Sequence, residues 1–191
     1  MLPAVDIDAA LADPQLLGAA MGNLRPWGTW RVVLKAAFGL PLTPAEVGTF
    51  GNVAGGRPAP AARVRELWCV IGRRSGKSRV AALVATYIAT CVDHRQRLVP
   101  GETGSVLVLA ASKSQASVVF GYVKGFLESS PILSRLIEEI TADEVRLAGG
   151  VVIGVHSNNS KTVRGRTLLG CVFDETGHWR DETSSQPDIE T

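Results

Sequence analysis

The segment at residues 72–78, Gly-Arg-Arg-Ser-Gly-Lys-Ser, contains the residue types of a loop that binds phosphate groups. Small residues allow successive backbone N–H groups to point into one concavity, where they bind an anion. Lys77 can reach the outer phosphates of a nucleotide, and the hydroxyl of Ser78 can ligate the metal ion that accompanies them. A helix that begins directly after the loop favours negative charge at its amino end. The segment therefore predicts an ATP site, with these residues in contact with the nucleotide: Gly72, Arg73, Arg74, Ser75, Gly76, Lys77 and Ser78.

The spacing of the glycines departs from the general pattern of such loops. In the pattern G-x-x-x-x-G-K-[ST] the first glycine would stand at position 71. This sequence has Ile71 there, and Gly72 follows one residue later. The alternative interpretation of the same residues is a turn between a strand and a helix, with Arg73, Arg74 and Lys77 in water.

Two adjacent carboxylates, Asp174 and Glu175, follow an apolar run much later in the chain. An enzyme that hydrolyses nucleoside triphosphates needs a carboxylate for the metal ion and a second group to orient the attacking water. Ligands bind at the carboxyl ends of parallel strands, so a strand that ends at this pair would bring it to the loop. We expect Asp174 to hold Mg²⁺, directly or through water, and Glu175 to polarise the nucleophilic water. The alternative interpretation is that the two carboxylates are simply the polar residues at which an apolar strand ends.

The elements that must position these residues follow from the pattern of apolar side chains. Short continuous apolar runs predict strands that are buried on both faces at 67–71, 105–111 and 167–175. Helical spacing predicts helices at 77–91, 114–128 and 131–140. Residues 144–157, around Gly149 and Gly150, predict two short strands of a hairpin. This order predicts an α/β fold of the P-loop NTPase class, with a mainly parallel sheet flanked by helices.

The chain divides into two parts by composition. Residues 1–60 are expected to form a helical and irregular lead-in, with five prolines between residues 26 and 60. Residues 61–191 carry the regular pattern and are expected to form the ATPase core. Because the sequence stops soon after Glu175, we expect this core to be incomplete at its carboxyl end.

Composition and charge exclude several classes of protein. The 191 residues are 46% hydrophobic and 20% charged, as in a globular domain with its own core. The net charge of +2 does not by itself demand nucleic acid. The three cysteines form no C-x-x-C pair, so neither a zinc site nor a disulfide framework is supported. No uninterrupted apolar run approaches the length of a membrane span, so no membrane partner is expected.

Several motifs together resemble one family. The loop GRRSGKS resembles the variant Walker A motif of tailed-phage terminase large subunits, and CVFDETGHW resembles their Walker B segment. TVRGRT, just upstream of the second motif, is similar to their Arg-Gly element. VLVLAASKSQASVVFGYVKGFL is similar to the family's next strand and helix, including its Gln-Ala pair. WGTWRVVLKAAFGLPLTPAEVGTF resembles their lead-in, so the resemblance covers residues 27–188.

The resemblance implies a DNA-packaging motor. Its ATPase domain would hydrolyse ATP with Mg²⁺ and drive double-stranded DNA, without sequence preference, into the procapsid. Its partners would be the portal protein, the small terminase subunit and further copies of itself in a ring on the portal. It would act in the cytoplasm of the bacterial host and transiently at the portal vertex. The family's C-terminal nuclease domain is expected to be absent, because this sequence has no room for it.

Four polar positions have two interpretations each. Arg73 and Arg74 either contact the γ-phosphate or lie in solvent. Arg164 is either an arginine finger delivered to a neighbouring subunit, as the resemblance implies, or a residue that binds DNA phosphate or caps a loop. Gln115 is either part of the corner between strand and helix at the site or a residue that merely starts a helix.

Two alternative functions remain open beside the packaging ATPase. A helicase-like P-loop ATPase would need further motifs and a second RecA-like domain. A module that binds nucleotide without turning it over would need only the loop and its helix.

Overall fold

Five strands form one sheet in the computed structural model, which describes residues 5–94, 96–157 and 165–179. The strands are β1 (Gly104–Ala110), β2 (Ile137–Ile140), β3 (Glu144–Leu147), β4 (Val151–Ser157) and β5 (Thr167–Asp174). They lie in the order β2-β3-β4-β1-β5. β1 is parallel to both of its neighbours, β4 and β5, whereas β3 is antiparallel to β2 and β4. The carboxyl ends of β1, β4 and β5 therefore meet at one edge of the sheet.

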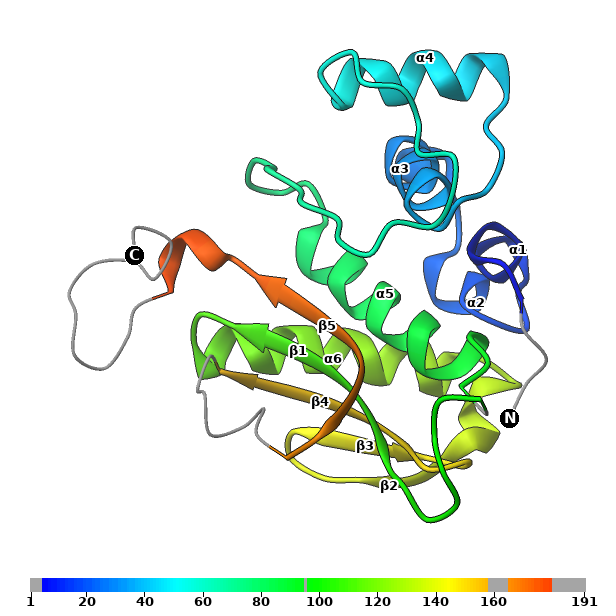
Figure 1. Cartoon of the computed structure of the whole chain (residues 1–191). Helices are drawn as coiled ribbons and strands as arrows, with labels where there is room; N and C mark the ends of the chain where they lie inside the picture. The colour runs from blue at the N-terminus through cyan, green and yellow to red at the C-terminus, as the bar shows by residue number, and fades with distance from the viewer. Residues whose placement is uncertain (1–4, 95, 158–164, 180–191) are drawn as a thin grey trace.

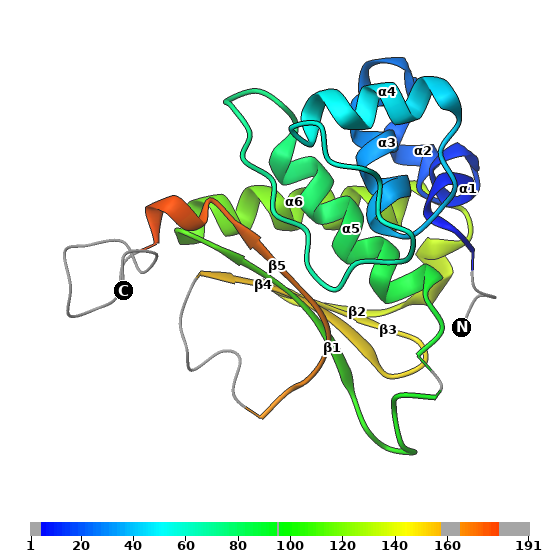
Figure 2. The ribbon, with the colours of Figure 1, turned by 45° about the horizontal axis from the view of Figure 1, so that its top comes forward.

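The helices of the described residues gather on one face of this sheet, as Figures 1 and 2 show. They are α1 (Ile7–Ala12), α2 (Gly18–Met21), α3 (Gly28–Ala37), α4 (Pro44–Val53), α5 (Lys77–Cys91) and α6 (Lys113–Ser129). Short 3-10 turns lie at Arg25–Trp27 (η1), Leu133–Leu136 (η2) and Thr176–His178 (η3). In the described part of the chain, no helix combines the length and the apolar character that crossing a bilayer requires.

The hydrophobic core lies between the sheet and α5 and α6. Val106 and Val108 of β1 point toward the helices and are fully buried, together with Val123 of α6. All seven residues of β1 are buried, as expected for the central strand of a parallel sheet. The expected strands at 105–111 and 167–175, the helices at 77–91 and 114–128 and the hairpin at 144–157 are confirmed, with small differences at their ends. The predicted α/β class, with parallel central strands and flanking helices, is confirmed as well.

The N-terminal helices extend the same core, with α1 against α5 and α3, α2 against α6, and α4 against α3. Ile7 and Leu11 of α1 and Leu34 of α3 belong to the buried cluster that includes the sheet residues. α4 begins with a capping box, in which the Thr43 hydroxyl accepts from the Glu46 N–H and the Glu46 carboxylate accepts from the Thr43 N–H. The Lys35 ammonium, 2.7 Å from that carboxylate, and the Thr43 N–H lower the pKa of Glu46 to about 2. This ion pair joins α4 to α3.

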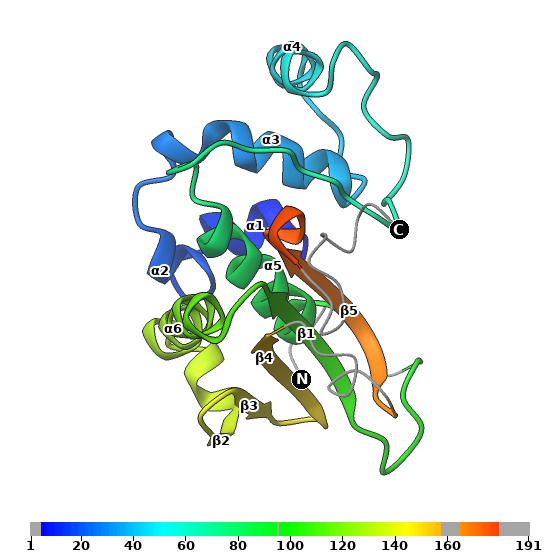
Figure 3. The ribbon, with the colours of Figure 1, turned by 90° about the vertical axis from the view of Figure 1, so that its left-hand side faces the viewer.

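The strand predicted at 67–71 is wrong: this segment is irregular and forms no strand pairing. Trp68 is 79% exposed and Val70 is fully exposed. Both flanks of the segment are tied to α3, by a hydrogen bond from the Val64 N–H to the Ala37 carbonyl (2.9 Å) and one from Trp30 to the Ser75 carbonyl (2.8 Å). Figure 3 shows the segment crossing α3 on its way to α5. Without a neighbouring strand to bond with, its apolar residues cannot form a strand.

The helix predicted at 131–140 is also wrong. Pro131 leads into the 3-10 turn η2, and the chain then continues as β2. Ile137 pairs with Leu147 and Ile140 with Val145, both in β3. Pairing with the hairpin therefore prevails over the helical spacing of this short segment.

Candidate active site

The loop at residues 72–76 leads directly into α5. Gly76 precedes the helix with φ of 81°, a left-handed conformation that glycine adopts without strain. Arg74 also has a positive φ, 62°, which is uncommon for a residue with a side chain. The Ser75 hydroxyl donates to the Gly72 carbonyl oxygen at 2.8 Å and closes the turn. Because α5 begins at Lys77, the positive end of its dipole lies at this loop.

Two tryptophans of the lead-in hold the loop in place. Trp30 donates its indole N–H to the Ser75 carbonyl oxygen at 2.8 Å. The ring of Trp27 lies directly against Gly76, because a Cβ added to that glycine would be 2.6 Å from the ring atom Cζ3. The guanidinium of Arg79, on the first turn of α5, lies over the Trp27 ring, 5.1 Å from its centroid. The loop is therefore positioned by η1 and α3 as well as by α5.

Gly76→Ala will lower the free energy of unfolding by about 1–3 kcal/mol, because alanine is strained at this φ and its Cβ collides with Trp27. Chemical denaturation without nucleotide measures the change. Gly72→Ala is the matched control, since nothing lies within 4 Å of the position of its Cβ. A loss of similar size in both variants would contradict the contact between loop and tryptophan.

The structure brings Ser78 and Asp174 into contact, although they are 96 positions apart in the chain. The Ser78 hydroxyl donates to Asp174 Oδ2 at 3.1 Å. Asp174 ends β5 beside Ala110, the last residue of β1, and is only 6% exposed. Trp179 donates its indole N–H to the Asp174 carbonyl oxygen at 3.1 Å. A hydroxyl and a carboxylate oxygen side by side are ligands of the kind that Mg²⁺ takes.

Glu175 lies next to this pair and faces Lys77. Its Oε1 is 3.9 Å from Lys77 Nζ, and the two side chains are 28% and 27% exposed. Its Oε2 accepts a hydrogen bond from the side-chain amide of Gln115, at the start of α6. Glu175 has φ of 55°, so the chain turns out of the sheet direction directly after Asp174. The carboxylate is therefore half-buried between a cation and an amide, where it could orient a water molecule.

The remaining predicted residues lie around the site or outside the described part of the chain. Arg73 and Arg74 are exposed on the loop, and Ser75 and Gly76 are partly buried in it. Arg164, the candidate arginine finger, lies outside the described residues. The roles assigned to all of these positions stay predictions.

The thiol of Cys171 is not a nucleophile of this site, although it belongs to the strand that ends at Asp174. Burial raises the pKa of Cys171 to about 11, so the thiol stays protonated near neutral pH.

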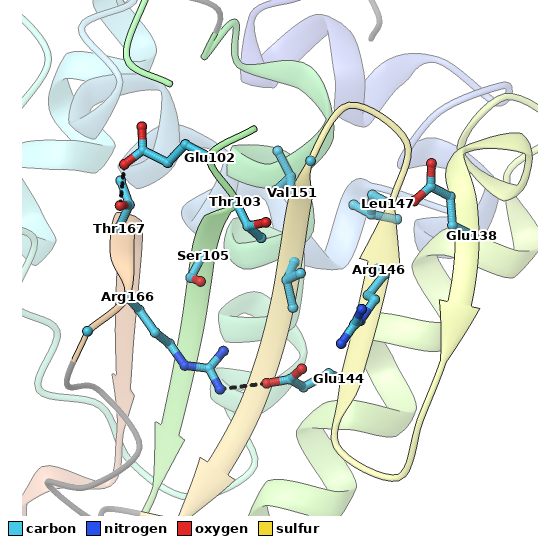
Figure 4. A pocket seen from close by; sticks show the side chains of 13 residues that line it. Glu102, Thr103, Ser105, Glu138, Glu144, Arg146, Leu147, Val151, Arg166 and Thr167 are labelled. Atoms are coloured by element: carbon cyan, nitrogen blue, oxygen red, sulfur yellow. Dashed lines mark hydrogen bonds and ion pairs between the residues drawn. The ribbon is translucent and has the colours of Figure 1, made fainter. Parts of the chain in front are cut away.

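A separate cavity of about 550 Å³ lies at the opposite, amino end of the parallel strands (Figure 4). Arg166 enters it from the start of β5 and donates to Glu144 Oε1 at 2.7 Å. Arg146, also in its wall, is 3.3 Å from a carboxylate oxygen of Glu139. Both arginines are already paired with carboxylates, so the described residues that line this cavity offer no unpaired positive charge to phosphate groups.

Sequence reasoning missed the three indole contacts at the site. Trp27 and Trp30 lie in the segment assigned to the lead-in, and Trp179 is the last residue of the motif CVFDETGHW. The spacing of Trp27 and Trp30 on the first turns of a helix was the available signal, but nothing in the sequence indicates that this helix lies over the loop.

Comparison with known proteins gives a likeness in fold. No protein-family model matches the chain, and no curated protein matches it either. The crystal structure of the HK97 bacteriophage large terminase is similar, with a TM-score of 0.53 and 18% sequence identity. The match covers 81% of this chain and 33% of that one, so this chain spans about a third of that protein's length. The resemblance stated from the sequence is thus confirmed at the level of the fold.

Proposed function

We propose that this chain is the ATPase part of a phage DNA-packaging terminase and hydrolyses ATP to translocate double-stranded DNA into the procapsid. The observation that carries the proposal is the convergence of Lys77, Ser78, Asp174 and Glu175 at the carboxyl end of β5. The fold likeness to the HK97 large terminase supports the same assignment. Translocation, the portal protein, the small terminase subunit and a ring of copies belong to this proposal.

The residues present fit a magnesium-bound triphosphate. Ser78 and Asp174 would hold Mg²⁺ together with oxygens of the β- and γ-phosphates, and the ion would neutralise charge that develops on them. Among the described residues no group of three His, Cys, Asp or Glu side chains could hold a metal ion. Magnesium bound by one carboxylate, one hydroxyl, phosphates and water does not need such a group.

The chain's own residues would then perform the hydrolysis. Lys77 binds the β- and γ-phosphates, so its ammonium exchanges the Glu175 carboxylate for phosphate oxygens. Glu175 accepts a hydrogen bond from the water that attacks the γ-phosphorus, and the bond to the β,γ-bridging oxygen breaks to give ADP and phosphate. The backbone N–H groups of the loop and the amino end of α5 stabilise the negative charge.

A nucleotide-binding module without turnover is the second candidate, and one observation favours it. The segment 67–71, which leads into the loop, is exposed and outside the sheet. The loop is therefore held by Trp27, Trp30 and α5 rather than by a strand. A loop anchored in this way can bind phosphates while placing them too loosely for efficient catalysis.

Turnover and binding of Mg-ATP separate the two candidates. We expect calorimetry to detect binding of Mg-ATP, and phosphate release to require Mg²⁺, stop with EDTA and resume when Mg²⁺ is restored. Duplex DNA of unrelated sequences should stimulate turnover equally, because a packaging motor contacts phosphates rather than base edges, and this stimulation should weaken as salt is raised. Binding without turnover, with or without DNA, would favour the second candidate. An absence of binding would exclude both.

A further inference from the structure

We propose that Gln115 is a positioning residue that orients the Glu175 carboxylate for its action on water. This inference rests on the proposed hydrolysis of ATP at the site and adds a residue to it. Gln115 lies on the first turn of α6, directly after β1, and its side-chain amide reaches Glu175 across the carboxyl edge of the sheet. β1 and β5 are paired up to Ala110 and Asp174, which brings the start of α6 next to Glu175.

The orientation of the Gln115 amide follows from the carboxylate that it faces. The Ser112 side chain caps α6 by accepting from the Gln115 backbone N–H at 3.3 Å. The Ser112 hydroxyl is 3.0 Å from the Ser114 hydroxyl and 3.4 Å from Gln115 Oε1, so the amide oxygen lies on the side of Ser112. The amide NH₂ group is on the side of Glu175 and donates to it. The reverse orientation would place the amide oxygen against a carboxylate oxygen, with no proton between them.

The two oxygens of Glu175 therefore have different surroundings. Oε2 is bonded to Gln115, which lies on a helix fixed by its cap and by the core. Oε1 is 3.9 Å from the Lys77 ammonium. In the proposed complex this ammonium would bind the phosphates of the nucleotide instead. Once Lys77 is bound to phosphate, Oε1 is available for water, and Gln115 still holds Oε2. The backbone of Glu175 has left the strand direction at φ of 55°, so the sheet alone does not fix this side chain.

Kinetics of two Gln115 variants test the proposal. In Gln115→Leu, which fills similar space without a donor, kcat should fall about 10-fold or more, because a displaced catalytic group loses much of its effect. The KM for Mg-ATP and the calorimetric affinity should stay within about twofold, because Gln115 does not contact the phosphates. Gln115→Glu should lose at least as much kcat, since its carboxylate repels Glu175. Gln15→Leu, the same substitution at an exposed position outside the site, is the matched control and should leave kcat unchanged.

Three kinetic outcomes would overturn the role of Gln115 while leaving ATP hydrolysis in place. An unchanged kcat in Gln115→Leu would show that Glu175 needs no partner. A raised kcat would show that Gln115 restrains the carboxylate instead of orienting it. Full activity in Gln115→Glu would show that only the size of the side chain matters.

A measurement without nucleotide separates this proposal from the proposed function. Denaturation midpoints are compared for Gln115→Leu, Glu175→Ala and the double variant. If the hydrogen bond exists, the double variant should lose clearly less stability than the sum of the two single losses. Additive losses would overturn the Gln115 contact whether or not the chain hydrolyses ATP. Coupling in a chain that shows no turnover would instead retain the contact and reject the proposed function.

Discussion

Lys77→Ala will abolish measurable ATP hydrolysis, with kcat/KM lower by at least about 10²- to 10³-fold. The ammonium is the one positive side-chain charge that the structure places next to Glu175 among the described residues, 3.9 Å from its Oε1. Without it the triphosphate loses a cation in both the ground state and the transition state, so affinity for Mg-ATP should fall together with kcat. Coupled phosphate-release assays and calorimetry on the same preparation measure both quantities.

The loss should not come from unfolding. Lys77 and Glu175 form a partly exposed ion pair with its charged atoms 3.9 Å apart. Pairs that solvent reaches contribute about 1 kcal/mol or less to stability. Lys124→Ala is the matched control, because Lys124 lies on α6 with its ammonium over the Phe120 ring, away from the nucleotide. Lys77→Ala with normal turnover would show that the loop is only a solvated turn and would remove the basis of the ATPase assignment.

Glu175→Gln will bind Mg-ATP with nearly normal affinity but turn it over about 10²- to 10⁴-fold more slowly. The amide keeps the size of the carboxylate and can still contact Gln115, but it cannot accept a proton from water. The decisive measurement is a single-turnover assay with bound radiolabelled ATP, in which the variant should retain unhydrolysed nucleotide.

This substitution also tests the alternative of a module that binds without turnover. In such a module the unmutated chain and Glu175→Gln would behave alike. Glu128→Gln, at an exposed position near the end of α6, controls for the loss of one negative charge. A Glu175→Gln variant as fast as the unmutated protein would assign the activation of water to another group.

Local signals in the sequence were sufficient for the helix that follows the loop and for the strand that ends at the carboxylates. α5 begins at Lys77 and ends at Cys91, as its glycine start and run of alanine, leucine and valine predict. The end of β5 at Asp174 follows from an apolar run that stops at a carboxylate. With Ser78 at the start of a helix and Asp174 at the carboxyl end of a parallel strand, the rule for ligand sites in α/β sheets predicts that the two residues approach each other.

Long-range pairing decided the parts that the sequence did not predict. The apolar run at 67–71 has the composition of a buried strand, but a strand also requires a neighbour, and this segment pairs with none of the described strands. The helix predicted at 131–140 is wrong for the opposite reason. This segment has a neighbouring strand, β3, which pairs with Ile137 and Ile140. The amide of Gln115 and the indoles at the loop were equally hidden, since contacts between distant segments leave no periodic trace in a single sequence.

The placement of the indoles gives this protein a built-in optical reporter. Three of its four tryptophans touch the site: Trp27 lies on Gly76, Trp30 is bonded to Ser75, and Trp179 is bonded to Asp174. The fourth, Trp68, is 79% exposed, so a dissolved quencher such as iodide would suppress its emission first. The fluorescence that survives quenching comes from rings beside the loop and beside Asp174. Ligand titrations can therefore be followed in the unlabelled chain, without a dye or a modified nucleotide.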